Sequence, residues 1–345
     1  MRSRVRNAIV LLVAIALVAL FLRNIDLWSV ASDIVHARPE WLILSLVTMT
    51  ANLAIRSLRW QYLLEPLGRT TFMSAFRATA VGFAANSVLP ARAGEVIRPY
   101  FLARSERRPH RLTATGAFAT IILERLLDVL TVLVLLASYV FVFGRDLETA
   151  NPTAFAWLKW IGALSSVGAL VALVFLFVLA GNPERLRLTL ERLERVLPST
   201  LAGLLARIAE KFARGLGVIR HPGRLLVALA WSFPLWLSIA VGIWAAAVAF
   251  QIAVPFTGSF LILGFLVLGV AVPTPGAVGG FHAAFRYGAT TFFGAPDTAA
   301  VGAAIVLHLL SIGPALLLGL VFAAQEGLNL AAMRRIADEA EEGRA

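Results

Sequence analysis

The sequence contains no cysteine, only two lysines and few charged residues of any kind. Without cysteine the chain can form neither disulfide bonds nor thiolate metal sites or thiol nucleophiles. Charged residues make up 15% of the 345 residues and hydrophobic residues make up 59%, and apolar runs of about 20 residues recur along the chain. The sequence therefore predicts an all-α polytopic membrane protein, with no room for a separate soluble catalytic domain.

Lysine is so scarce that arginine supplies almost all of the positive charge, and the net charge is +11. In a soluble protein such a charge would suggest a nucleic-acid partner. Here the arginines gather in a few short segments between apolar runs, which is typical of orientation by the positive-inside rule and of contact with anionic lipid. We therefore expect no nucleic-acid partner.

The common signatures of catalysis are also missing from the sequence. It has no HExxH helix and no glycine-rich phosphate loop beside a strand. We expect no enzyme activity, no metal and no cofactor. A carboxylate pair, Glu124 and Asp128, is the single feature that would support an intramembrane enzyme.

One stretch joins an apolar segment to a broken backbone and several charges. Residues 86–98 read NSVLPARAGEVIR and follow directly on the apolar segment 72–89. Arginines flank both sides of this segment, so a full crossing would place one basic cluster outside, against the positive-inside rule. Irregular backbone at membrane depth also needs protein or a water-filled cavity around it. We therefore predict a re-entrant hairpin over about residues 72–103 that opens to the cytoplasm.

A second interrupted segment lies near the end of the chain. Residues 259–272 are apolar but too short to cross a bilayer comfortably, and the sequence PTPGAVGG follows at 273–280 before a second short apolar run to Phe293. This predicts a re-entrant hairpin over 259–293 that opens to the outside. The chain would then hold about six full spans and two oppositely oriented hairpins, which makes eight hydrophobic segments in an inverted-repeat arrangement.

The remaining segments complete a single membrane domain over residues 1–345. We expect an uncleaved first helix at 8–22, a non-cytoplasmic loop at 23–40, a cytoplasmic amphipathic segment at 181–224 and a cytoplasmic tail at 325–345. Both termini would be cytoplasmic. The arginine-rich, alanine-rich composition suggests a bacterial cytoplasmic membrane.

The long apolar helix expected at 112–143 carries three charged residues near its middle: Glu124, Arg125 and Asp128. Glu124 and Asp128 lie four residues apart and so share one helix face. Charges at that depth cost several kcal/mol unless they are paired or hydrated. Two interpretations stay open, a structural ion-pair knot between helices and a role in a translocation path.

Three further polar features inside apolar segments have two interpretations each. Arg56 and Arg59 share a helix face. They either point at a ligand or, in the favoured interpretation, snorkel to the membrane interface as anchors. His308 is either a satisfied structural histidine, the favoured reading, or a proton relay. Arg286 either lines an outer gate or anchors the interface.

Three motifs together resemble the transmembrane domain family of lysylphosphatidylglycerol synthase/flippase proteins, over roughly residues 41–324. They are Asn86-x-x-Leu89-Pro90-x-Arg92-x-Gly94-Glu95-x-x-Arg98, Glu124-Arg125-x-x-Asp128 and Pro273-x-Pro275-Gly276-x-x-Gly279. The resemblance implies a flippase-like lipid translocase that moves a phospholipid or lipid-linked molecule between leaflets. The substrate-binding residues it implies are Asn86, Pro90, Arg92, Gly94, Glu95, Arg98, Glu124, Arg125, Asp128, Pro275, Gly276, Gly279 and His282.

Within this resemblance, arginines would neutralise the phosphate of a lipid headgroup, and carboxylates would pair with them or accept a cationic headgroup. The chain departs from the family in having Phe281-His282 where an acidic residue often follows the third motif, and His282 would be its substitute. Bifunctional members carry a C-terminal aminoacyltransferase domain and this chain stops at Ala345, so we do not expect synthase activity. The alternative function is a non-transporting accessory subunit that presents lipid to a partner synthase.

Overall fold

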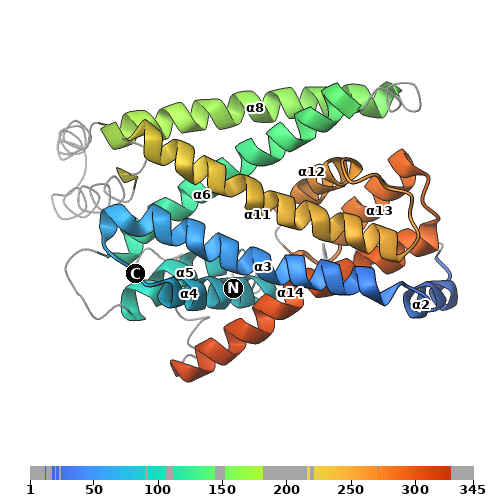
Figure 1. The fold of residues 1–345 in the computed structure, drawn as a ribbon, viewed down its shortest axis with the longest axis horizontal. Helices are drawn as coiled ribbons and strands as arrows, with labels where there is room; N and C mark the ends of the chain where they lie inside the picture. The colour runs from blue at the N-terminus through green and yellow to red at the C-terminus, as the bar shows by residue number, and fades with distance from the viewer. Residues whose placement is uncertain are drawn as a thin grey trace.

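The protein is all-helical throughout the part that the computed structural model describes, which comprises residues 12, 18–19, 21–22, 25–89, 92–105, 112–143, 152–181, 216–217, 221–272 and 274–327. These residues form ten α-helices, most of which lie along the long axis of the molecule (Figure 1). They are α2 (Leu27–Val35), α3 (Pro39–Leu64), α4 (Phe72–Val88), α5 (Gly94–Ser105), α6 (Ala114–Ser138), α8 (Pro152–Gly181), α11 (Pro222–Ala249), α12 (Gly258–Ala271), α13 (Gly280–Phe293) and α14 (Asp297–Gln325).

Four helical stretches in this part of the chain are long and apolar enough to cross a membrane. They are Pro39–Leu67, Ala114–Val142, Pro222–Ala249 and Asp297–Gln325, each of 28 or 29 residues. A helix of this length spans about 42 Å, more than the roughly 30 Å hydrocarbon core of a bilayer. The prediction of an all-α, multi-pass membrane protein is confirmed.

The long helices run in alternating directions along the bundle (Figure 1). The start of α3 lies beside the end of α11, where the Arg38 N–H donates to the Ala249 carbonyl at 3.0 Å. At the other end of the same pair, Arg224 forms a 3.3 Å ion pair with Glu65. Helices α3 and α11 therefore pack antiparallel over their whole length.

Helices α4 and α5 form one helical hairpin and α12 and α13 form another, and the two open at opposite ends of the bundle (Figure 1). The start of α4 lies beside the end of α14, where the rings of Phe76 and Phe322 are 6.1 Å apart. The start of α12 lies beside the end of α13, where Gly258 faces the ring of Phe293. Each hairpin thus returns to the end of the bundle from which it starts.

Each hairpin is closed by a pair of glycines that brings two backbones together. In the first hairpin, a Cβ on Gly94 would collide with the carbonyl oxygen of Gly82. In the second, a Cβ on Gly269 would collide with the carbonyl oxygen of Gly280, and one on Gly280 would collide with that of Gly269. The obstacle in each case is backbone, which cannot swing aside, so only glycine fits at these contacts.

The stretch 23–40, expected as a non-cytoplasmic loop between two spans, contains the short helix α2, which the sequence analysis did not predict. The Asp26 carboxylate caps the helix by accepting the Ser29 hydroxyl at 2.7 Å and the Trp28 N–H at 3.0 Å. These two hydrogen bonds, that of Ser29 first, lower the pKa of the Asp26 carboxyl. An aspartate just before an apolar stretch is a normal helix-start signal, and it identifies this short helix in retrospect.

Several predicted features lie mostly or wholly outside the described residues. These are the first helix at 8–22, Pro90, the amphipathic segment at 181–224 and the tail at 325–345.

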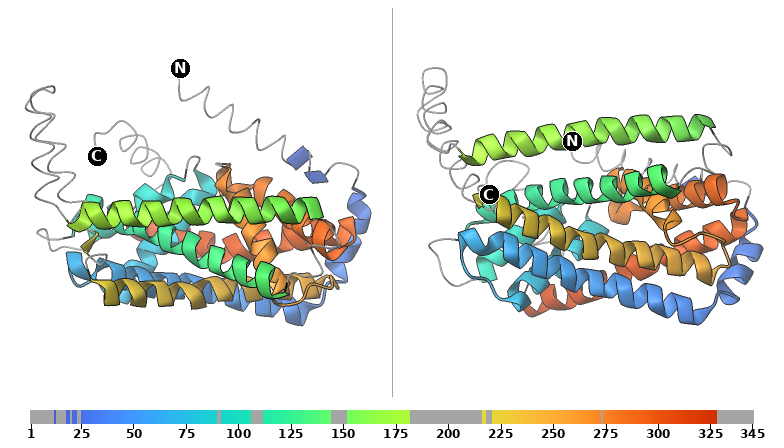
Figure 2. Two further views of the ribbon diagram at one scale, coloured as in Figure 1. Left: turned by 90° about the horizontal axis from the view of Figure 1, so that it is seen from above. Right: turned by 45° about the horizontal axis from the view of Figure 1, so that its top comes forward.

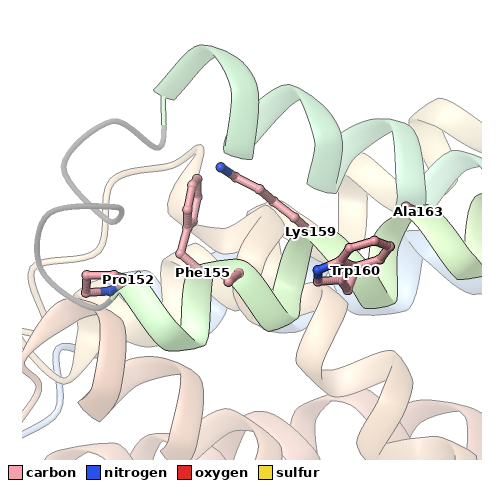
Figure 3. A pocket seen from close by; sticks show the side chains of 6 residues that line it. Pro152, Phe155, Lys159, Trp160 and Ala163 are labelled. Atoms are coloured by element: carbon pink, nitrogen blue, oxygen red, sulfur yellow. The ribbon is translucent and has the colours of Figure 1, made fainter.

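Helix α8 lies at one edge of the bundle and packs mainly against α6 (Figure 2). A groove of about 360 Å³ lies beside its first turns, lined by Pro152, Phe155, Ala156, Lys159, Trp160 and Ala163. Lys159 projects in the same direction as Phe155, with its ammonium 4.3 Å from the ring centre (Figure 3). The lining is mainly apolar, and it contains none of the residues predicted to bind substrate.

Candidate functional site: a buried ion-pair network

Two arginines of α3 and two carboxylates of α6 face one another inside the bundle. Arg56 and Arg59 lie three residues apart and Glu124 and Asp128 lie four apart, so each pair occupies one face of its helix. Their exposed fractions are 0% for Arg59 and Glu124, 3% for Asp128 and 4% for Arg56. The favoured prediction that Arg56 and Arg59 snorkel to the interface is wrong, because both side chains turn inward to the carboxylates of α6.

Arg59 lies at the centre of this ion-pair network. Its Nη1 donates to Asp128 Oδ1 at 2.7 Å and its Nη2 donates to Glu124 Oε1 at 3.0 Å. Arg56 donates to Asp128 Oδ2 at 3.2 Å, and Arg98 of α5 donates to Glu124 Oε2 at 2.7 Å. Both oxygens of each carboxylate therefore have a guanidinium partner, which offsets the cost of removing these charges from water.

Helix α11 joins the network through two neutral side chains. The Trp236 indole N–H donates to Asp128 Oδ1 at 3.0 Å, and Arg59 donates to the Ser232 hydroxyl at 2.7 Å. Helices α3, α5, α6 and α11 consequently meet around these charges.

Arg98 is held by an aromatic ring as well as by Glu124. Its guanidinium carbon lies 3.8 Å from the centre of the Trp60 ring, a favourable cation–π distance. Trp60 is itself positioned by donating its indole N–H to the Thr120 hydroxyl at 2.9 Å. The Nε and Nη2 atoms of Arg98 are buried and have no hydrogen-bond partner in the described part of the chain.

The network continues towards the surface through Arg125, Glu95 and Arg92. Arg125 Nη1 lies 3.5 Å from Asp128 Oδ2, and its Nε lies 3.5 Å from Glu95 Oε1. Arg92 Nη1 lies 3.7 Å from the same Glu95 oxygen. These three side chains are 38%, 25% and 40% exposed, so the network runs from a buried centre to a partly open end.

The network carries more positive than negative charge. It joins five arginines to three carboxylates, a formal excess of two positive charges. Buried N–H groups of four of these arginines also lack hydrogen-bond acceptors within the described residues; they belong to Arg56, Arg59, Arg98 and Arg125. The excess of positive charge and of unpaired N–H donors suits an anionic ligand with several acceptor oxygens, such as a phosphate group.

The carboxylates of the network are all engaged by arginines rather than arranged around a metal position. Across the described residues, no group of three or more histidine, aspartate and glutamate side chains is placed to hold a metal ion.

The turn of the first hairpin lies next to the open end of the network. Asn86 caps α5 by accepting the Gly94 N–H at 2.7 Å. Arg92 has a φ of 54°, in the left-handed region that non-glycine residues rarely adopt. Its Nη2 donates to the carbonyl of Val270 in the last turn of α12 at 2.8 Å. The turn of one hairpin is thereby tied to the helix of the other.

The turn of the second hairpin depends on two glycines and two histidines. Gly276 and Gly279 have φ values of 60° and 87°, and Pro275 starts the short 3-10 turn that contains Gly276. The His282 Nδ1 accepts the Gly279 N–H at 3.3 Å. The His308 Nε2 lies 2.7 Å from the Gly276 carbonyl, to which it donates.

The predicted substrate-binding residues therefore fall into two groups. The network contains Arg92, Glu95, Arg98, Glu124, Arg125 and Asp128, and the hairpin turns contain Asn86, Gly94, Pro275, Gly276, Gly279 and His282. The hydrogen bond from Arg92 to Val270 links the groups. Arg286 lies apart from both, where it pairs with Asp297 at 2.8 Å and donates to the Phe21 carbonyl at 2.6 Å.

The sequence interpretation missed several members of the network. Besides Arg56 and Arg59 they are Trp60, Ser232 and Trp236. One signal was available for the arginines, because two arginines three apart in one apolar span match two carboxylates four apart in another. No comparable pattern marks the tryptophans and the serine, whose roles depend on which helices become neighbours.

The fold and this network together define a multi-pass α-helical membrane protein with a buried, net-cationic ion-pair network where four helices meet. Residues 7–319 match the family described as the lysylphosphatidylglycerol synthase TM region, and the chain belongs to that family. The match spans nearly the whole chain, which confirms the resemblance inferred from the three motifs.

The chain is also similar to the UPF0104 membrane protein MJ1595 of Methanocaldococcus jannaschii. The two are 25% identical over 173 residues, which is 49% of this chain. The aligned stretch also covers 49% of the relative's length, so the chain spans about half of that protein.

Proposed function

We propose that the protein is a lipid translocase that moves a phospholipid or lipid-linked molecule with a phosphate-containing headgroup between the two leaflets. Membership of the lysylphosphatidylglycerol synthase TM region family supports a lipid-handling role. The observation that carries the proposal is the net-cationic network, which reaches from the buried centre of the bundle to half-exposed arginines beside a hairpin turn.

The architecture of this translocase is six full spans and two re-entrant hairpins. The spans are the helix expected at residues 8–22 together with α3, α6, α8, α11 and α14. One half of the chain has the order α3, hairpin, α6 and the other has the order α11, hairpin, α14, with the two hairpins entering from opposite sides. This is the inverted-repeat plan in which transporters place a substrate site between the repeats.

The two ends of the network have different roles in this proposal. The buried pairs of Arg56 and Arg59 with Glu124 and Asp128 hold the helices together, so both interpretations of the charges in α6 apply, each to a different part of the network. Arg125 at the open end faces the headgroup, because its side chain is 38% exposed. A phosphate that contacts arginines there avoids the several kcal/mol that its charge would cost in hydrocarbon.

The protein works in the cytoplasmic membrane of a bacterium, with both termini in the cytoplasm. It transports without catalysing a reaction and needs no cofactor. Its partners are the membrane lipids that it moves. A synthase that makes the transported lipid would be a suitable protein partner.

A liposome assay with purified protein tests the proposal. Fluorescent anionic, zwitterionic and cationic phospholipids are compared, and their movement between leaflets is followed by quenching from outside. Arg125→Ala should reduce movement roughly 10- to 100-fold, because a charge-assisted contact of about 1.5–3 kcal/mol is lost. Arg104→Ala is the matched control, since Arg104 is exposed near the end of α5 and outside the network.

Two results would contradict the translocase. One is that folded wild-type protein moves no lipid of any class, which would favour the accessory subunit that presents lipid to a partner. The other is that Arg125→Ala and Arg104→Ala behave alike, which would remove the network from the transport path.

A further inference from the structure

The Glu95 carboxylate lies between two arginines without forming a close contact with either. Its Oε1 is 3.5 Å from Arg125 Nε and 3.7 Å from Arg92 Nη1. The pairs deeper in the network are shorter, for example 2.7 Å between Arg98 and Glu124. Arg125 Nε is buried and makes no hydrogen bond within the described residues, so Glu95 neutralises this arginine without satisfying its donor.

The same position is open to the surroundings. The Arg92 and Arg125 side chains are 40% and 38% exposed, and Glu95 is 25% exposed. Arg125 also forms an ion pair with Asp128, with 3.5 Å between Arg125 Nη1 and Asp128 Oδ2, so it keeps its place when Glu95 moves. A flexible glutamate can therefore turn away while both guanidinium groups remain.

Arg92 connects this position to the second hairpin. One of its terminal nitrogens faces Glu95 and the other donates to the Val270 carbonyl at 2.8 Å. That carbonyl is in the last turn of α12, where carbonyl groups lack partners within their own helix. The left-handed backbone of Arg92, with a φ of 54°, is a conformation that a non-glycine residue keeps only while other contacts hold it.

We propose that Glu95 is a displaceable counter-ion and that the gap between Arg92 and Arg125 is a binding subsite for a phosphate group. This rests on the proposed function and names the place where the headgroup phosphate enters the network. Phosphate oxygens bind two guanidinium groups in short, bidentate contacts that a single carboxylate oxygen cannot provide. As the phosphate draws Arg92 towards itself, the bond to Val270 breaks and the two hairpins uncouple.

Ligand binding to purified protein in detergent tests the subsite without requiring transport. The probes are dioctanoyl phosphatidylglycerol, dioctanoylglycerol, which lacks phosphate, and inorganic phosphate. Glu95→Gln removes the competing charge and keeps the size, so phosphatidylglycerol should bind roughly three- to tenfold more tightly. Arg92→Gln should weaken its binding, which keeps the test valid if Glu95→Gln does not fold. Glu65→Gln is the matched control, because Glu65 is exposed and pairs with Arg224 away from the network.

Each probe distinguishes a source of the phosphate. Tighter binding of phosphatidylglycerol alone identifies a lipid headgroup site, and tighter binding of inorganic phosphate as well identifies a site for the phosphate itself. Equal strengthening of dioctanoylglycerol would overturn the subsite, because the gain would then come from the acyl chains. Unchanged or weaker binding to Glu95→Gln would also overturn it.

The uncoupling of the hairpins is tested with a single cysteine in the natively cysteine-free chain. The Ser87 carbonyl lies next to Gly276 of the second hairpin, 3.4 Å from where a Cβ on that glycine would be. Phosphatidylglycerol should speed the reaction of a maleimide with Ser87→Cys several-fold and leave that with Met73→Cys, at the exposed start of α4, unchanged. An equal rate with and without lipid would overturn the uncoupling.

The subsite and the proposed function can fail separately. Tighter binding by Glu95→Gln in a protein that moves no lipid would keep the subsite and reject the translocase. The translocase would be kept and the subsite rejected if the wild-type protein moves lipid while neither Glu95→Gln nor Arg92→Gln changes the affinity for phosphatidylglycerol.

Discussion

At the scale of single residues, the main feature is the dependence of each buried charge on a partner from another helix. Asp128 accepts hydrogen bonds from Arg56, Arg59 and Trp236, which come from two other helices. Removing one partner of a buried ion pair leaves an uncompensated charge, which costs more than the pair itself contributes. The network therefore stabilises the arrangement of the helices only as a complete set.

Asp128→Ala should destabilise the protein by about 3–5 kcal/mol, because it leaves two buried guanidinium groups without their shared carboxylate. The measurement is the unfolding temperature in detergent micelles. Glu65→Ala serves as the control, since the Glu65–Arg224 pair is 48% and 42% exposed and such pairs contribute about 0–1 kcal/mol. Similar effects of the two changes would mean that water already compensates the charges around Asp128.

At the scale of helical elements, the two hairpins are closed by the same device, a contact between two glycine backbones. The sequence predicted where each hairpin breaks, because proline and glycine interrupt both apolar segments. It did not predict that Gly82 meets Gly94 or that Gly269 meets Gly280. Those contacts depend on the angle at which each pair of short helices packs, which no local pattern encodes.

Gly94→Ala should destabilise the first hairpin by about 1–3 kcal/mol, because the new Cβ collides with the Gly82 carbonyl and the Asn86 side chain. The expected result is a lower unfolding temperature together with slower lipid movement in liposomes. Gly168→Ala is the matched control, since a Cβ there meets no described atom within 4 Å. A Gly94→Ala protein as stable as the control would show that the hairpin opens easily enough to accept a side chain.

At the scale of the whole molecule, the defining property is the opposite orientation of the two hairpins within one helical bundle. The ends of the α4–α5 hairpin lie with the ends of α3 and α14, and those of the α12–α13 hairpin lie with the end of α11 and the start of α14 (Figure 1). In the proposed translocase, hairpins that enter the membrane from opposite sides would let a site between them open to one leaflet at a time.

Single-cysteine labelling with a membrane-impermeant maleimide tests this topology in cells. Arg69→Cys and Ser105→Cys flank the first hairpin and should both be protected until the membrane is permeabilised. Ala253→Cys and Ala295→Cys flank the second hairpin and should both react in intact cells, because the absence of native cysteine leaves no background. Opposite behaviour within either pair would mean that this segment crosses the membrane instead of returning.

The sequence by itself determined the class of the protein, its family and the breaks in its two interrupted segments. Run length, composition and the positions of proline and glycine are local properties, and they are sufficient for the class and the breaks. The family followed from the resemblance of three short motifs, which are local as well. Only the tertiary structure decided which charges pair, because Arg56 and Asp128 are 72 residues apart and meet through the packing of helix faces. For the same reason it turned Arg56 and Arg59 from expected surface anchors into the centre of a buried network.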